Sequence, residues 1–177
     1  MLNTVLGTLS SGVAASTSSY ESIASATGTG SSGTITFSSI PQTYASLQLR
    51  WQALSTPAYV LLNVNGAVPN YLHYLYGSGS AVGANGAANF GYLIVNEETS
   101  TTYPYVGITD FIDYASTTKN KTIRNFSGKD SNSSSSEIML SSYLINSTTA
   151  ITSISVIAVT QNWATTTQVS LYGIKGA

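Results

Sequence analysis

Hydrophobic and polar residues alternate with a period of two along most of the chain. Leu47, Leu49 and Trp51 are separated by single polar residues, and Ile35 and Phe37 alternate with threonines in the same way. Successive side chains of a β-strand point to opposite faces, so this alternation predicts strands with one buried face. No long segment shows the spacing of an amphipathic helix.

Further segments of the same character follow, separated by stretches rich in Gly, Ser and Asn. The remaining strand candidates are residues 59–64, 71–76, 90–95, 105–114, 122–126, 138–145, 154–160 and 168–174. Asn65 and Gly66 form a typical type I′ hairpin turn after the first of them. Residues 77–88, 99–104 and 128–136 are predicted breaks. We expect the first and last of these to be exposed loops, because they lack a bulky anchoring side chain.

About nine to eleven short strands at near-regular spacing predict an all-β fold, an antiparallel β-sandwich or jelly roll. We assign residues 20–177 to this single domain and residues 1–19 to an extended N-terminal arm. The arm is rich in Ser, Thr, Ala and Gly, with a small apolar patch at Leu2, Val5 and Leu6. A tail of this composition becomes ordered most readily when a partner holds it, so we interpret residues 1–19 as an attachment arm.

The chain carries few charges. Only 7% of its 177 residues are charged and the net charge is −1, whereas about a quarter is usual in soluble proteins. A neutral, hydroxyl-rich surface favours association over repulsion, which indicates a chain that packs into an assembly. Six Lys and Arg residues are too few for a nucleic-acid partner. No apolar run is long enough to span a membrane, and the absence of cysteine excludes disulfides.

Residues with catalytic potential are few and scattered. The single histidine, His73, lies in an aromatic segment, and a Ser-His-Asp arrangement would need it together with Asp110 or Asp113. No G-x-S-x-G motif is present. Glu97 and Glu98 are adjacent, so on a strand their side chains would point to opposite faces. We therefore expect no catalytic residue and no enzymatic activity.

One segment has the alternating oxygen ligands of a calcium loop. Asp130, Asn132 and Ser134 have this spacing, but Ser135 stands where an EF-hand loop requires glycine, and no glutamate occupies the last position. A solvated Ser/Asn loop is the simpler interpretation. We expect no metal and no cofactor.

Two groups of residues are candidates for contacts with other proteins. Four of the six basic residues lie within eleven positions: Lys119, Lys121, Arg124 and Lys129. They fit either a patch that meets an acidic partner surface or an edge strand on which lysines oppose aggregation, and both interpretations stay open.

The second group is a pair of tyrosines. Tyr103 and Tyr105 flank Pro104 in a predicted loop. Tyrosine offers a rigid apolar face with a polar tip, which suits protein interfaces and sugar stacking alike. We expect these two side chains to make exposed contacts.

Several short segments occur here in a specific combination. They are Tyr20-Glu-Ser-Ile-Ala, Phe37-Ser-Ser-Ile-Pro-Gln-Thr-Tyr, Leu47-Gln-Leu-Arg, Asn70-Tyr-Leu-His, Leu75-Tyr-Gly-Ser-Gly, Asp110-Phe-Ile-Asp-Tyr, Lys119-Asn-Lys-Thr-Ile-Arg, Ala150-Ile-Thr-Ser-Ile and Leu171-Tyr-Gly-Ile-Lys-Gly. With them the chain after residue 19 resembles small structural proteins of tailed bacteriophages. Residues 61–66 depart from the Arg-Phe-Asn-Gly-like run of that group. The resemblance implies a virion component with a β-sandwich body and implies no catalytic residue.

Composition, arm and resemblance together predict a capsid-exterior decoration or cement protein on the outer surface of the virion. Its expected partners are copies of itself, as a trimer, and the major capsid or other virion proteins. The alternative is a tail, baseplate or fibre component. Another alternative is an adhesin that contacts host glycans through residues 77–88, 99–105 or 128–136.

Overall fold

The computed structural model describes residues 18–55, 59–94, 100–129 and 136–176. These residues form twelve strands in two antiparallel sheets, which confirms the predicted all-β sandwich. The described part of the chain contains no helix that could cross a membrane. Of the predicted arm, residues 1–17 lie outside the described ranges, and with them Leu2, Val5 and Leu6.

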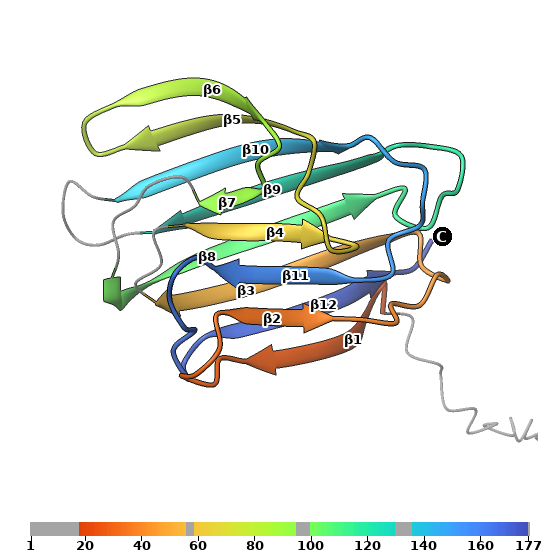
Figure 1. Ribbon diagram of the computed structural model, residues 1–177, viewed down its shortest axis with the longest axis horizontal. Coiled ribbons are helices and arrows are strands. Elements are labelled where there is room, and N and C mark those ends of the chain that lie inside the picture. The colour runs from red at the N-terminus through yellow and green to blue at the C-terminus, as the bar shows by residue number, and fades with distance from the viewer. Residues whose placement is uncertain (1–17, 56–58, 95–99, 130–135, 177) are drawn as a thin grey trace, which may run out of the picture.

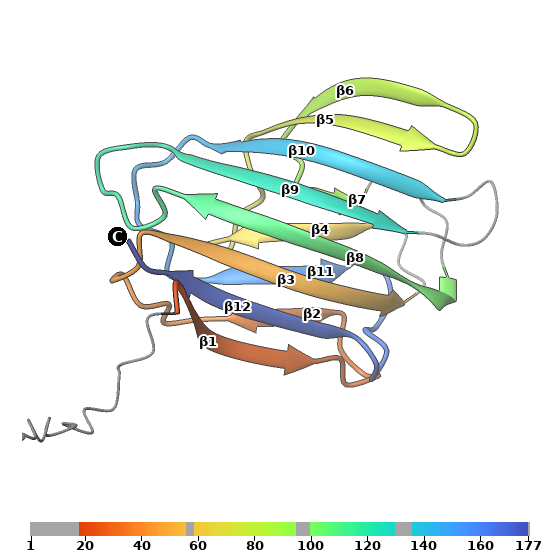
Figure 2. The same cartoon turned by 180° about the vertical axis from the view of Figure 1, so that it is seen from behind.

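The two sheets differ in size and lie face to face (Figures 1 and 2). The larger sheet has, in spatial order, β1 (Tyr20–Thr27), β12 (Gln168–Ile174), β3 (Ser46–Ser55), β8 (Ser100–Ile112), β9 (Lys121–Lys129), β10 (Glu137–Ile145), β5 (Tyr71–Ser78) and β6 (Val82–Ala88). The smaller sheet has β2 (Thr34–Phe37), β11 (Ile154–Ala158), β4 (Val60–Val64) and β7 (Tyr92–Ile94).

The core lies between the two sheets and is built from alternate residues of each strand. Leu47 and Leu49 of β3 face Leu62 of β4 and Val156 of β11 across this layer, and all four are fully buried. Burying apolar side chains from both inner faces is what stabilises a sandwich of this kind. The period-two pattern of the sequence therefore reports the inner face correctly.

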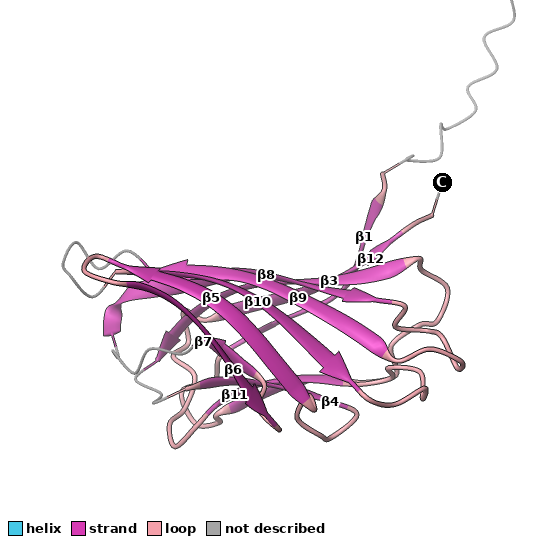
Figure 3. Cartoon of the chain, turned by 90° about the horizontal axis from the view of Figure 1, so that it is seen from above, coloured by secondary structure: helices cyan, strands magenta, loops and turns pink. Residues whose placement is uncertain are grey.

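The larger sheet extends beyond the smaller one on the side of β5 and β6. β7 contacts β9, and the hydroxyl of Tyr143 in β10 donates to the carbonyl oxygen of Tyr92 in β7. β5 and β6 lie beyond this border and curve away from the flat part of the sheet (Figures 1 and 3). None of the seven residues of β6 is buried. The hairpin is attached to the body through the pairing of β5 with β10 and through Leu72 of β5, which is fully buried in the core.

The structure corrects the predicted loop at residues 77–88. This segment contains the end of β5, a tight turn at Gly79 and Ser80, and all of β6. The sequence predicts a loop here because the segment lacks a bulky anchoring side chain, and its small residues have low intrinsic strand propensity. Seven consecutive pairs with β5 supply the strand conformation instead.

Two further boundaries differ from the prediction. β8 begins at Ser100 and includes Pro104, where a break was expected. Its register with β3 is irregular between Ala53 and Ser55, and proline is tolerated in a sheet at such irregular positions. β1 was not separated as a strand, because Tyr20–Thr27 contains few large apolar residues.

Candidate interaction surface

The outer face of the larger sheet carries a continuous stripe of exposed apolar side chains. This face points away from the smaller sheet and toward the viewer in Figure 2. One row across β8, β9, β10 and β5 consists of Ile108, Phe126, Leu140 and Leu75, and the next row adds Val106, Ile138 and Val82. We call these seven residues the apolar stripe. Their exposed fractions run from 43% for Ile108 to 86% for Val82.

The apolar stripe exists because strands of the larger sheet carry apolar residues at outward as well as inward positions, as β10 shows. In β10, Ile138 and Leu140 point outward while Met139 and Tyr143 are buried. Antiparallel sheets with one solvated face normally place polar residues at the outward positions. Together the seven side chains expose roughly 600 Å² of apolar surface. This area is at the upper end of the range found for the largest apolar patch on a typical monomer. Patches of this size are often functional contact surfaces.

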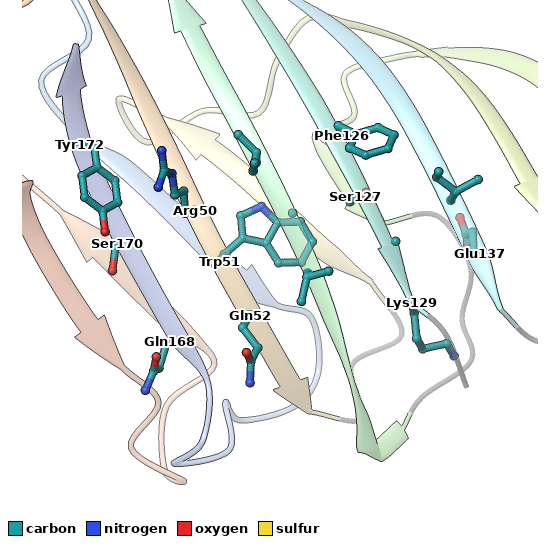
Figure 4. A pocket seen from close by; sticks show the side chains of 15 residues that line it. Arg50, Trp51, Gln52, Phe126, Ser127, Lys129, Glu137, Gln168, Ser170 and Tyr172 are labelled. Atoms are coloured by element: carbon teal, nitrogen blue, oxygen red, sulfur yellow. The ribbon is translucent and has the colours of Figure 1, made fainter. Parts of the chain in front are cut away.

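A shallow groove of about 640 Å³ opens on this face beside Phe126 (Figure 4). Gly128 lies at an outward position between Val106 and Ile138. Because it has no side chain, the groove is deeper at this position. The opposite wall carries the amide side chains of Gln52 and Gln168. The groove is therefore apolar beside Phe126 and carries uncharged amides on the opposite wall, and Lys129 and Glu137 also line it.

One end of the groove is closed by a fixed cation. The guanidinium carbon of Arg50 lies 5.0 Å from the ring centre of Tyr20 and 4.9 Å from that of Tyr172. Arg50 Nε donates to Gln48 Oε1 at 2.8 Å, and Gln48 Nε2 donates to Asp110 Oδ1 at 2.8 Å. Two aromatic faces and this hydrogen-bonded chain hold the guanidinium in place.

The residues considered for catalysis occupy a neighbouring row of the same face. His73 of β5 lies opposite Ser142 of β10, and both line a second hollow of about 520 Å³ together with Arg124. Asp110 is in β8, three strands from His73, which places it about 14 Å away at the usual strand spacing. The described strands therefore bring serine and histidine together but hold Asp110 too far away to orient the imidazole. Asp113 lies beyond the end of β8.

The structure separates the four basic residues of the predicted cluster. Lys119 is exposed and pairs with Asp113 at 3.3 Å, and Arg124 is exposed on the outer face of β9. Lys121 is fully buried, and its Nζ donates to three backbone carbonyl oxygens at 2.6, 2.7 and 3.2 Å. Burial lowers the pKa of Lys121, and the charge of Asp113 partly offsets this shift. Lys129 is also buried. Only Lys119 and Arg124 of this group present charge to a partner.

The two predicted contact tyrosines also differ from each other. Both belong to β8 and not to a loop. Tyr103 is 40% exposed, whereas Tyr105 is buried and the Nζ of Lys129 lies 4.9 Å from its ring centre. Tyr103 keeps a surface from which it can contact a partner, and Tyr105 instead packs inside the fold.

The described residues contain no group of three or more His, Cys, Asp or Glu side chains that could hold a metal ion. Residues 130–134, whose spacing resembles a calcium loop, lie outside the described ranges, and so do Glu97 and Glu98. Comparison with protein-family models, with curated proteins and with solved structures finds no match for this chain.

Proposed function

We propose that this chain is a structural protein of a virus particle, a decoration or cement protein on the capsid exterior, and that the apolar stripe is its docking surface. The observation that carries the proposal is the exposure of seven large apolar side chains on one face of a chain with a net charge of −1. The resemblance of several segments to those of small structural proteins of tailed bacteriophages supports the virion role. Residues 1–19 act as a second attachment.

The stripe is large enough to hold the chain on a particle. Burying roughly 600 Å² of apolar surface contributes about 15 kcal/mol at 25 cal/mol per Å². Loss of translational and rotational freedom, together with side-chain ordering, offsets most of this gain. A single chain would therefore bind with moderate affinity, and an arm that binds at the same time would raise the effective affinity.

Charges placed in the stripe should abolish binding to the particle. We expect the double variant Phe126→Glu and Leu140→Glu to bind capsids stripped of this protein at least about 100-fold more weakly, because docking would bury unpaired carboxylates. Its melting temperature should fall only modestly: both side chains are about half exposed in the free chain, although they lie directly opposite each other on β9 and β10, where two carboxylates repel. Co-sedimentation with the stripped capsids measures the binding.

Thr122→Glu is the matched control, because Thr122 is exposed on the same face of β9 but outside the stripe. It should bind like the unmodified chain. A chain lacking residues 2–19, measured in parallel, separates the contribution of the arm from that of the sheet. Full binding by the folded double variant would contradict the proposed docking surface. Exclusive binding to tails in the same preparation would favour the tail or fibre alternative.

A further inference from the structure

The two sheets have four borders, and three of them carry features that oppose strand pairing. β1 contains a bulge between Ser22 and Ala24, and its Glu21 pairs with Lys175 at 3.0 Å. β2 has four residues, and β7 has three with a register shift against β4. Bulges, charges and short length are the usual means by which edge strands avoid association.

The fourth border, β6, has none of these features. Its seven residues, Val82–Ala88, pair with β5 in an unbroken register. The strand contains no charged residue and no proline, and its largest apolar side chain is Val82. An unprotected strand of this length presents a row of backbone groups to any strand that approaches it.

The hydrogen bonds at both ends of the hairpin define which backbone groups point outward. Ser78 N donates to Ala81 O at 2.7 Å, and Asn89 N donates to Asn70 O at 2.7 Å. Hydrogen-bonded residues of an antiparallel pair recur at every second position, so the odd-numbered residues of this strand bond to β5. The residues that direct their N–H and C=O groups to the open border are Val82, Ala84, Gly86 and Ala88.

One outward amide is held by the chain itself. Gly86 N donates to Oδ1 of the neighbouring Asn85 at 2.8 Å. A local side-chain acceptor of this kind serves an amide that lacks a partner strand. Asn85 is exposed, so its side chain can turn away when a strand replaces it.

We infer that β6 pairs with β6 of a second copy of this chain, so that two eight-stranded sheets join into one across a two-fold axis. The axis at Asn85 places Ala84 opposite Gly86 of the second copy, and Val82 opposite Ala88. This register forms about eight backbone hydrogen bonds. The inference does not depend on the virion role.

A second copy fits this border for two reasons. In a two-fold interface the same strand lies on both sides, so a charged strand would repel its copy, and β6 is neutral. The small side chains of the strand also leave the second backbone free to approach. The axis is perpendicular to the sheet, so both outer faces stay on the same side. The apolar stripe, which already reaches Val82 and Leu75, then continues from one copy to the other.

The mass of the full chain in solution tests this pairing. We expect a dimer by sedimentation or light scattering, and a dissociation constant at least about tenfold higher in Ala84→Pro, which loses an outward N–H and the pairing around it. Proline is tolerated here in the single chain because this N–H does not bond to β5. Circular dichroism verifies that the variant is folded.

A second variant and a second measurement keep the test decisive if Ala84→Pro fails to fold. Ala84→Lys adds an edge charge and should also weaken the dimer, whereas Ser25→Lys places the same charge on the outer face of β1 and should not. Amide exchange at the even-numbered residues of β6 should be slow in the dimer and fast in either Ala84 variant. A chain that is monomeric at all concentrations, a trimer, or a dimer unaffected by both Ala84 variants would overturn the inference.

Discussion

Replacing Trp163 with alanine is expected to lower the free energy of unfolding by about 3–5 kcal/mol. Trp163 is fully buried and lies in the connection from β11 to β12, beside the connection from β1 to β2. Its indole N–H donates to Val156 O at 3.3 Å. A Cβ added to Gly28 would lie 2.8 Å from Trp163 Cβ, so the two connections are in close contact. Alanine would leave a large cavity where they meet.

Urea denaturation of the unmodified chain and of Trp163→Ala measures this difference in the free energy of unfolding. Trp163→Phe is the matched variant, because it retains much of the apolar volume and loses the indole N–H, and it should cost clearly less than alanine. The midpoint should shift without a change in slope if the transition stays two-state. If Trp163→Ala lowers the free energy of unfolding by less than about 1 kcal/mol, the two connections must move into the cavity left by the indole, and Trp163 does not hold them together.

The second large effect is expected at Asn125, a buried polar residue in the middle of β9. Its Oδ1 accepts from Thr109 Oγ1 at 2.9 Å, and its Nδ2 donates to Leu93 O at 3.1 Å and to Ser127 Oγ at 3.1 Å. Leu93 belongs to β7, so the amide joins the larger sheet to the smaller one. Asn125→Leu leaves Thr109 without its acceptor inside the core. We expect a loss of about 2–4 kcal/mol in the free energy of unfolding.

Arg124→Leu provides the control for this variant. The substitution introduces the same side chain one position earlier, but Arg124 is exposed on the outer face of β9, and surface changes of this kind stay within about 0.5 kcal/mol. Thermal or urea unfolding of the unmodified chain, Asn125→Leu and Arg124→Leu compares their free energies of unfolding. Equal stability of Asn125→Leu and Arg124→Leu would show that the buried hydrogen bonds between the sheets contribute nothing net.

The alternation of the sequence was sufficient to predict most of the inner face. β12 has the predicted bounds, residues 168–174, and β3 buries Leu47, Leu49 and Trp51 as the pattern indicates. The sequence could not predict β6, because its small residues carry no pattern and its conformation comes from pairing with β5. Secondary structure of this kind comes from pairing with the neighbouring strand of the hairpin and not from the pattern of its own residues.

The candidate surface was less accessible to prediction than the fold. The apolar run Ile138-Met139-Leu140 was a signal for a strand with two apolar faces, but sequence alone does not say which face another layer covers. Lys121 shares the parity of the buried Ile123, which was a signal for its burial. Its carbonyl partners Ser116 and Thr148 come from separate connections, and their meeting point depends on the tertiary structure.

The position of the hairpin formed by β5 and β6 also determines where the chain can tolerate added sequence. Its turn at Gly79 and Ser80 is exposed and lies on the left side of the molecule in Figure 1, at the end of the hairpin. Exposed loop tips of small polar residues are where proteins most readily accept insertions. A peptide inserted there should be displayed beyond the rim of the sandwich without disturbing the pairing of β5 with β6.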